Sequence, residues 1–354
     1  MAMQSITISG LFSLLPVWFM TKLPVFLWGT MGSAKSSSIH QYVEDRRVED
    51  PTFGFIDLRL SQLDPVDVRG LPSIDKEKKE ASWIPFNSFP NEERDGKNGI
   101  LLLEEFNSAI PQVQTTMYQL LFDRRIGDYI LPDGWVVWAL GNRACDGGHT
   151  YDMLAPVSNR FVGHYHLDPT VIDYTRHGLT VGVREEILGF LNWRPALLFS
   201  YDPDSSDLAF GSMRTWSYLS TLFNAWEETY GRIDYSNPPE LFRVMVMNAV
   251  GEGEGVEFIA YLDGHGKRPN LDNIISDPEG SEIPEAMNIC WAVISGLTNR
   301  FKNDRQIAGR VLRYACRMQA EFATVLVRQC TNVDSEFMEN PEMVQFTQKF
   351  GAII

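Results

Sequence analysis

The chain has 354 residues, of which 44% are hydrophobic and 22% charged, and it carries a formal net charge of -15. This composition is that of a folded globular protein and excludes disordered and fibrous classes, while the length favours more than one domain. The acidic balance opposes affinity for nucleic-acid backbones and anionic lipids, because both need a cationic surface.

The cysteines and the first apolar stretch indicate the cellular compartment of the protein. The four cysteines are Cys145, Cys290, Cys316 and Cys330. They form no CxxC pair and are too far apart for a zinc knuckle or a small disulfide framework. The stretch 11–28 is interrupted by Pro16, Lys22 and Pro24, so we expect a helix and a buried strand, not a membrane span. We predict a cytoplasmic protein without membrane association.

The first half of the chain alternates strand and helix patterns. Short apolar runs predict strands at 24–28, 53–57, 99–103, 135–140 and 161–167. Helix-compatible stretches lie between them, notably 36–47 and 111–121. This alternation is typical of a parallel sheet with helices on both faces. We therefore predict one three-layer αβα domain over residues 1–167.

The second half shows helical periodicity and few strand patterns. The predicted helices lie at 183–191, 213–230, 239–250, 284–300 and 307–329, with a glycine-rich turn at 251–255. We predict a helical lid domain over residues 168–265 and a C-terminal helical region over 266–354.

The segment GTMGSAKS, residues 29–36, joins an apolar strand to the start of a helix. Such a junction directs backbone N–H groups and the helix dipole at phosphates, while Lys35 would reach the β and γ oxygens and Ser36 would bind Mg²⁺. Ala34 replaces the usual glycine, at a cost of about 1 kcal/mol if the loop needs positive φ. The candidate ATP-binding residues are Gly29, Thr30, Met31, Gly32, Ser33, Ala34, Lys35, Ser36 and Ser37.

Polar residues follow two later strands. GILLLEEFN, residues 99–107, has the Walker B arrangement, in which Glu104 would hold the metal and Glu105 would orient the attacking water. Glutamate at the first position adds one methylene to the usual aspartate, which is expected to slow hydrolysis. Asn142 follows the strand 135–140 at the carboxyl edge of the sheet, where it would also hold water. Arg160 lies just before the last predicted strand. From this position its guanidinium would reach the γ-phosphate of a neighbouring subunit.

The order of these motifs resembles that of the MoxR-type AAA+ ATPases, within the dynein-related AAA subfamily, over nearly the whole chain. The stretch from Glu104 to Asn142 is the most specific part, because it joins Walker B, a helix, a hairpin and sensor 1 without a gap. The resemblance implies that residues 1–167 form an AAA+ nucleotide-binding domain. It also implies that Arg160 is a trans-acting arginine finger and that Arg214, in GSMRTW, is sensor 2 on the lid, although Met213 replaces the usual proline.

The resemblance further implies an ATP-dependent and Mg²⁺-dependent ring, commonly a hexamer. Its role would be chaperone-like remodelling of a protein client beside a von Willebrand factor A partner. The segment 56–72 is similar to a family signature in which Asp67, Arg69 and Gly70 shape the rim or pore of the ring.

Two alternatives stay open. One is a nucleotide-gated scaffold with little turnover, suggested by Ala34 and Glu104. The other is a nucleic-acid motor using basic loops such as Arg124–Arg125 or Lys76–Lys79, which the net charge of -15 disfavours.

Overall fold

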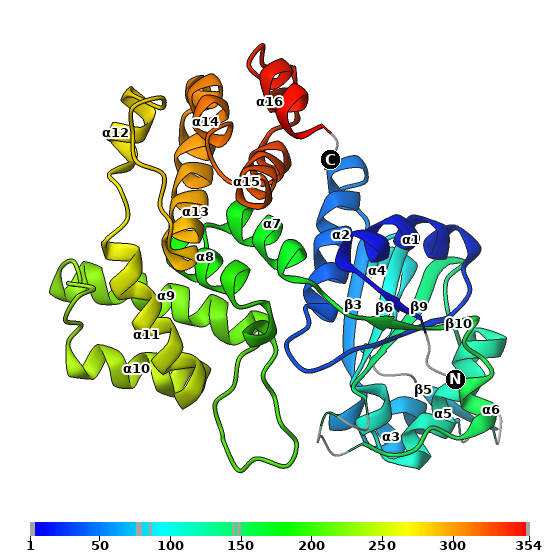
Figure 1. The fold of residues 1–354 in the computed structure, drawn as a ribbon. Helices are drawn as coiled ribbons and strands as arrows, with labels where there is room; N and C mark the ends of the chain where they lie inside the picture. Colours follow the sequence, from blue (N-terminus) through cyan, green and yellow to red (C-terminus); the bar gives the residue numbers. More distant parts are fainter. Residues whose placement is uncertain (1–3, 76–79, 85–86, 144–145, 147–149, 352–354) are drawn as a thin grey trace. The chain divides into compact units, whose positions relative to one another are not determined.

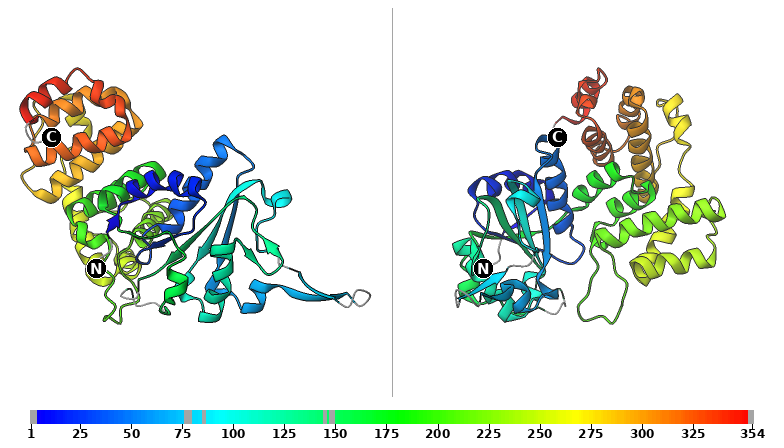
Figure 2. Two further views of the ribbon diagram at one scale, coloured as in Figure 1. Left: turned by 90° about the vertical axis from the view of Figure 1, so that its right-hand side faces the viewer. Right: turned by 180° about the vertical axis from the view of Figure 1, so that it is seen from behind.

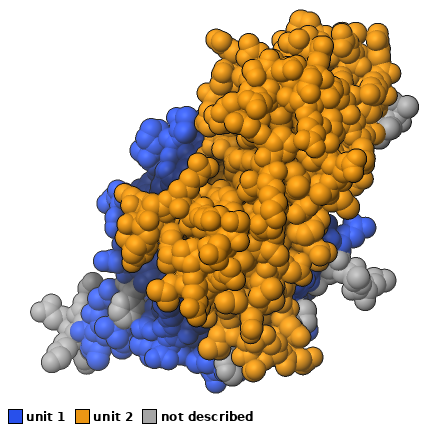
Figure 3. Space-filling model, turned by 60° about the vertical axis from the view of Figure 1, so that its left-hand side comes forward, with its two compact units in different colours: residues 1–169 blue, residues 170–354 orange. Residues whose placement is uncertain are grey.

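The computed structural model describes all residues except 1–3, 76–79, 85–86, 144–145, 147–149 and 352–354, so Cys145 and the basic segment Lys76–Lys79 lie outside the described residues. The chain forms two compact units, Met1–Pro169 (unit 1) and Thr170–Ile354 (unit 2), which Figure 3 colours separately. Within the described residues, no helix is long and apolar enough to cross a membrane.

Unit 1 contains a six-stranded parallel sheet with the order β1-β10-β2-β9-β6-β3 (Figure 1). The five predicted strands are all present, and a short edge strand that the sequence did not predict pairs with the last of them. The strands are β1 (Ser5–Ile6), β2 (Val25–Trp28), β3 (Gly54–Arg59), β6 (Asn98–Glu104), β9 (Gly134–Gly141) and β10 (Gly163–Leu167).

Helices cover both faces of this sheet, which confirms the predicted αβα class. Alternate strand residues point to opposite faces and bury two separate apolar cores. One core packs α1 (Ile8–Thr21) and α2 (Lys35–Glu49) against residues such as Leu102 and Trp138. The other packs α5 (Pro111–Asp123) against residues such as Leu103 and Trp135.

The described part of unit 1 also contains two hairpins and three short α-helices. Figure 2 shows the β4–β5 hairpin reaching away from the sheet. The hairpins are β4 (Leu71–Asp75) with β5 (Glu80–Ile84), and β7 (Arg125–Ile126) with β8 (Tyr129–Ile130); the helices are α3 (Pro65–Arg69), α4 (Glu92–Asp95) and α6 (Ala155–Ser158). The hairpin expected after Walker B is the second of these.

Unit 2 is helical throughout its described elements, as the sequence predicted. Its α-helices are α7 (Val171–Val181), α8 (Glu185–Trp193), α9 (Met213–Tyr230), α10 (Glu240–Val250), α11 (Glu252–Gly266), α12 (Leu271–Ser276), α13 (Met287–Asn303), α14 (Ala308–Ala315), α15 (Ala320–Val333) and α16 (Met343–Phe350). Its division into a lid and a C-terminal region stays a prediction.

The prediction of a glycine-rich turn over residues 251–255 was wrong. Gly251, with φ 108°, ends α10, and α11 begins at the next residue. Gly255 lies inside α11, at its contact with α10. A Cβ on this residue would come within 2.8 Å of the Cα of Met247. This glycine therefore permits close helix packing and does not mark a turn.

Candidate functional site

The loop between β2 and α2 has the backbone of a phosphate cradle. Gly32 and Ala34 both adopt left-handed conformations, with φ of 71° and 63°. The N–H groups of Gly32, Ala34 and Ser36 donate to no other group among the described residues. Left-handed turns leading into a helix N-terminus leave such donors converging on one point, which suits an anion. The cost foreseen for Ala34 therefore applies, because alanine sits where positive φ is required.

Close packing holds this loop in shape. A Cβ on Gly29 would meet Ser33 Oγ at 2.8 Å and the Leu167 carbonyl at 3.2 Å, so only glycine fits there. Ser33 is 1% exposed and its hydroxyl donates to the Thr30 carbonyl at 2.7 Å. These contacts fix the loop between the ends of β2 and β10.

Lys35 is the first residue of α2 and its ammonium lies inside the loop. Its Nζ donates to the carbonyls of Gly29 at 2.7 Å and Thr30 at 2.9 Å, and to Asn142 Oδ1 at 3.1 Å. The last contact joins residues 107 positions apart in the sequence, because β2 and β9 are neighbours in the sheet. The predicted phosphate-binding lysine and the predicted sensor 1 asparagine therefore occupy one site.

Glu104 ends β6 beside the start of α2. Burial raises its pKa, while a hydrogen bond from the Ser36 side chain and the charge of Lys35 oppose that rise and Asp57 adds to it. A cation next to Glu104 and Ser36 would favour the ionised carboxylate. The two predicted metal ligands are thus in contact, and their oxygen donors are of the kind Mg²⁺ prefers.

Glu105 adopts φ 54° and ψ 35°, a left-handed conformation that is uncommon for a residue with a side chain. Its carboxylate accepts a hydrogen bond from the Ser61 hydroxyl. Ser61 lies in a 3₁₀ turn, Leu60–Gln62, that directly follows β3. The turn after β6 therefore aims Glu105 along the carboxyl edge of the sheet, toward the turn after β3.

Asn107 is a site residue that the sequence reasoning missed. Its Nδ2 donates to the Asn142 carbonyl at 2.8 Å, and its Oδ1 accepts from the Asn142 N–H at 3.2 Å. The side chain is 3% exposed. It fits because Gly141 has no Cβ, which would come within 2.6 Å of Asn107 Oδ1. An asparagine two positions after the second glutamate was the available signal, but spacing alone does not indicate this contact.

Arg160 is held away from the residues described so far. Its guanidinium lies over the Tyr118 ring, 3.1 Å from the centroid, and donates to the Pro156 carbonyl at 3.0 Å. Tyr118 belongs to α5, so these contacts are on the α5 side of unit 1. The structure does not bring Arg160 together with Lys35 or Glu105 within one chain, and its role as an arginine finger stays a prediction.

Arg214 belongs to unit 2. It is exposed in the first turn of α9, which starts with Met213 and is capped by Ser212. Met213 is 4% exposed, so the residue in place of the usual proline anchors this helix in the core. The sensor 2 role of Arg214 stays a prediction.

The expected rim residues take part in local capping. Asp67 accepts from the Asp64 N–H at 2.9 Å and completes a capping box on α3. Gly70 ends that helix with φ 87°, and Arg69 is exposed beside α5. Their place in a ring stays a prediction.

Comparisons with known proteins give distant likenesses. No protein-family model and no curated protein matches the chain. Solved structures that it is similar to include a provisionally assigned ATPase of Cytophaga hutchinsonii, with 12% identity, TM-score 0.34, and 99% of this chain and 90% of that chain covered.

Two further solved structures have similarly low sequence identity and TM-scores. NtrX of Brucella abortus in complex with ADP has 11% identity and TM-score 0.41, with 99% of this chain and 70% of that one covered. A RuvB variant of Thermotoga maritima has 12% identity and TM-score 0.39, with 83% and 82% covered.

Proposed function

We propose that this chain binds ATP with Mg²⁺ in the loop Gly29–Ser37 and hydrolyses it. The observation that carries this proposal is the meeting of Lys35 Nζ with Asn142 Oδ1 at 3.1 Å, beside the contact between Ser36 and Glu104. One edge of the sheet then carries a loop of free N–H donors, a lysine, a hydroxyl, paired carboxylates and an amide. That set is what phosphoryl transfer to water needs.

Each residue has a separate role. The loop N–H groups and Lys35 bind the β- and γ-phosphates. Ser36 and Glu104 would hold Mg²⁺, which supplies neutralisation of phosphate charge. Glu105 orients the attacking water and accepts its proton, and Asn142 fixes that water's position.

Binding and hydrolysis are tested separately. In calorimetric titration of the full chain with Mg-ATP, Lys35→Ala is expected to weaken binding by more than about tenfold, because charged hydrogen bonds to phosphate are worth about 1.5–3 kcal/mol. Lys97→Ala, which removes the same charge before the amino end of β6, should bind as the wild type does. Glu105→Gln should retain ATP binding and lose turnover. Equal affinity of Lys35→Ala and wild type would reject the proposed site.

The arrangement of Arg160 supports a ring as the working form. An arginine finger in trans is useful only in an oligomer, and the contact with Tyr118 keeps this guanidinium ordered on the α5 side. We propose a homo-oligomer, commonly a hexamer in the resembled family, acting in the cytoplasm on a protein client. A von Willebrand factor A partner and a chaperone-like role rest on the MoxR resemblance alone.

A mixing experiment tests the finger. Arg160→Ala and Lys35→Ala subunits should each be inactive alone, and their mixture should recover activity, because a Lys35→Ala subunit can supply Arg160 to an intact neighbouring site. Sedimentation of Glu105→Gln with ATP should show the ring. Activity of isolated monomers would contradict this part of the proposal.

A scaffold with little turnover is the second candidate. The raised pKa of Glu104 and the hydrogen bond that Ser61 donates to Glu105 both favour it. A wild-type rate no higher than that of Glu105→Gln would establish it. Among the described residues nothing comparable favours the nucleic-acid motor, because the Arg124 guanidinium donates to the Pro132 and Trp135 carbonyls of its own chain, at 2.9 and 2.7 Å.

A further inference from the structure

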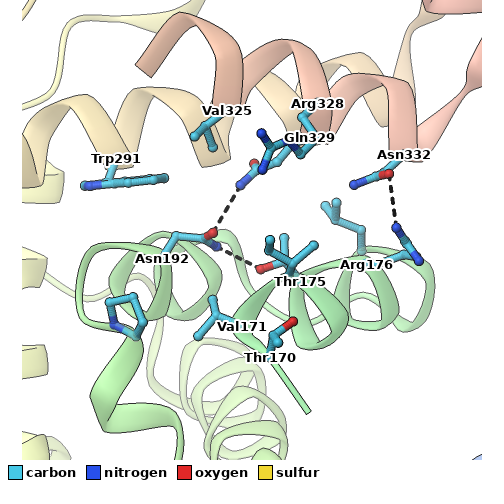
Figure 4. Close-up of a pocket in the computed structure, with 13 residues that line it drawn as sticks. Thr170, Val171, Thr175, Arg176, Asn192, Trp291, Val325, Arg328, Gln329 and Asn332 are labelled. Carbon is cyan, nitrogen blue, oxygen red and sulfur yellow. Dashed lines mark hydrogen bonds between the residues drawn. The ribbon is translucent and has the colours of Figure 1, made fainter. Parts of the chain in front are cut away.

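Unit 2 contains a pocket of about 340 Å³ between α7, α8, α13 and α15 (Figure 4). This volume is within the range of small-molecule sites, which are typically about 300–1,000 Å³. All of its lining residues belong to unit 2, so the pocket is separate from the site on the sheet edge of unit 1.

The walls are mainly apolar, and one of them is aromatic. Val171, Leu179 and Val325 line the pocket, and the indole of Trp291 forms one side. Phe322 packs edge-on against Trp291, with ring centroids 5.8 Å apart and planes at 85°. This contact fixes the indole, so the pocket offers a preformed flat surface to an aromatic ring.

Two amide side chains, the buried Gln329 and the half-buried Asn192, line the pocket from different helices. Asn192 Nδ2 donates to Thr175 Oγ1 at 2.8 Å, and Gln329 Nε2 donates to Asn192 Oδ1 at 3.4 Å. An amide nitrogen carries two N–H groups, and the second one on Gln329 has no acceptor among the described residues. Gln329 is 7% exposed, so this donor is shielded from bulk water. A ligand oxygen would satisfy it.

Arg328 adds a positive charge beside that amide. Figure 4 shows Arg328 beside Gln329 on α15, with Gln329 reaching toward Asn192, and the Arg328 side chain is exposed at the pocket. Arg328 forms no hydrogen bond or ion pair with any described residue, whereas Arg176 on the facing wall donates to Asn332 at 3.4 Å. None of the described residues that line the pocket is acidic, although the chain has a net charge of -15. The local charge therefore favours an anion.

We propose that this pocket binds an aromatic group bearing a carboxylate, either a free acid or the end of a peptide. The ring would lie against Trp291 between Val171 and Val325, and the carboxylate would accept from the Arg328 guanidinium and the free N–H of Gln329. A planar carboxylate matches the fork of a guanidinium better than a single-point anion does. This inference does not depend on ATP binding in unit 1.

Paired probes that differ only in charge test the proposal on the full chain. Calorimetric titration should give saturable binding of indole-3-propionate and at least tenfold weaker binding of indole-3-propionamide. Arg328→Gln should abolish this preference by weakening the acid alone. Arg310→Gln removes the same charge from α14, outside the pocket, and should leave both affinities unchanged.

A second variant locates the binding. Val325 is only partly buried, so Val325→Trp is expected to fold, as unchanged far-UV circular dichroism would show, and to block both probes. A peptide ending in tryptophan, tested with a free and an amidated terminus, distinguishes the two sources of the same chemistry. The proposal fails if wild type binds neither acid nor peptide, if Val325→Trp binds as wild type does, or if Arg328→Gln retains the preference for the acid.

Discussion

The side-chain amide of Asn107 bonds both backbone polar groups of Asn142, donating to its carbonyl at 2.8 Å and accepting from its N–H at 3.2 Å. Asn107 lies in the 3₁₀ turn that directly follows Glu105. The residue that would orient water and the residue that would hold it are thus connected through two hydrogen bonds between neighbouring strand ends.

Removing this connection should affect turnover more than binding. In Asn107→Ala the backbone groups of Asn142 lose their partners, which costs about 1–3 kcal/mol of unfolding free energy. Misplacement of Asn142 should also lower kcat by about tenfold or more while the Kd for ATP changes little. Denaturant unfolding and steady-state kinetics measure the two effects.

Asn107→Asp is a second variant, which removes only one of the two hydrogen bonds. Its carboxylate can still accept from the Asn142 N–H but cannot donate to the carbonyl, so its kcat should also be low. A kcat equal to wild type in both variants would show that Asn107 does not position Asn142.

Ser61 should restrain Glu105. The hydroxyl of Ser61 donates to the Glu105 carboxylate, which would otherwise be available to water. Ser61→Ala is therefore expected to raise kcat by about two- to tenfold, the equivalent of a hydrogen bond worth 0.5–1.5 kcal/mol, with ATP affinity unchanged. The same substitution in a Glu105→Gln background should have no effect, and a lower kcat in the single variant would oppose the idea.

Ala34→Gly should stabilise the loop. Alanine at φ 63° carries a conformational cost that glycine avoids, so the free energy of unfolding is expected to rise by up to about 1 kcal/mol. Gly32→Ala introduces the same cost at φ 71° and should lower the free energy of unfolding by a similar amount. Denaturant titration of both variants tests the sign, and destabilisation by Ala34→Gly would contradict the strained backbone.

Acid should destabilise unit 2 in two steps. Burial and the adjacent Arg268 lower the pKa of His265 to about 3 from an ordinary 6.5, so the neutral ring is favoured in the folded state. Burial alone would raise the pKa of Glu186, but the Arg184 guanidinium, 2.7 Å from its carboxylate, lowers it to about 2. Both pKa values are depressed on folding, so the unfolded chain binds more protons in acid.

The pH windows follow from these values. Stability should fall below pH 6.5 as the unfolded chain protonates His265, by about 1.4 kcal/mol per pH unit for one proton. A second loss should begin near pH 4.5 and continue toward pH 2 as Glu186 protonates. In denaturant titrations, His265→Gln should remove the loss between pH 6.5 and 4.5 and lessen the slope from pH 4.5 to about 3, where the two losses overlap. An unchanged slope between pH 6.5 and 4.5 would count against a neutral buried His265.

The strand pattern could be predicted because parallel strands buried on both faces read as continuous apolar runs, as in GILLLE. β1 escaped prediction because its two residues, Ser5 and Ile6, carry no periodicity. α11 was misjudged because glycine was taken as a helix breaker, whereas Gly255 is required for contact with Met247. Packing of this kind depends on tertiary neighbours that no local pattern reveals.

The site could be predicted where residue type and strand position act together, as for Lys35 and Asn142. The restraint of Glu105 by Ser61 and the stacking of Arg160 on Tyr118 were not predictable, because each joins residues from different elements. The pocket in unit 2 was also invisible in the sequence, since its walls come from four helices.

Because Asn107 binds only the backbone of Asn142, the two positions should differ in how freely they vary under selection. Any residue other than proline at 142 keeps the N–H and carbonyl that Asn107 needs, so the side chain at 142 can change with the demands of hydrolysis. At 107, only an amide of this length both donates and accepts there. Selection of a randomised library for folded ATP-binding chains should therefore fix asparagine at 107 and recover many residues at 142.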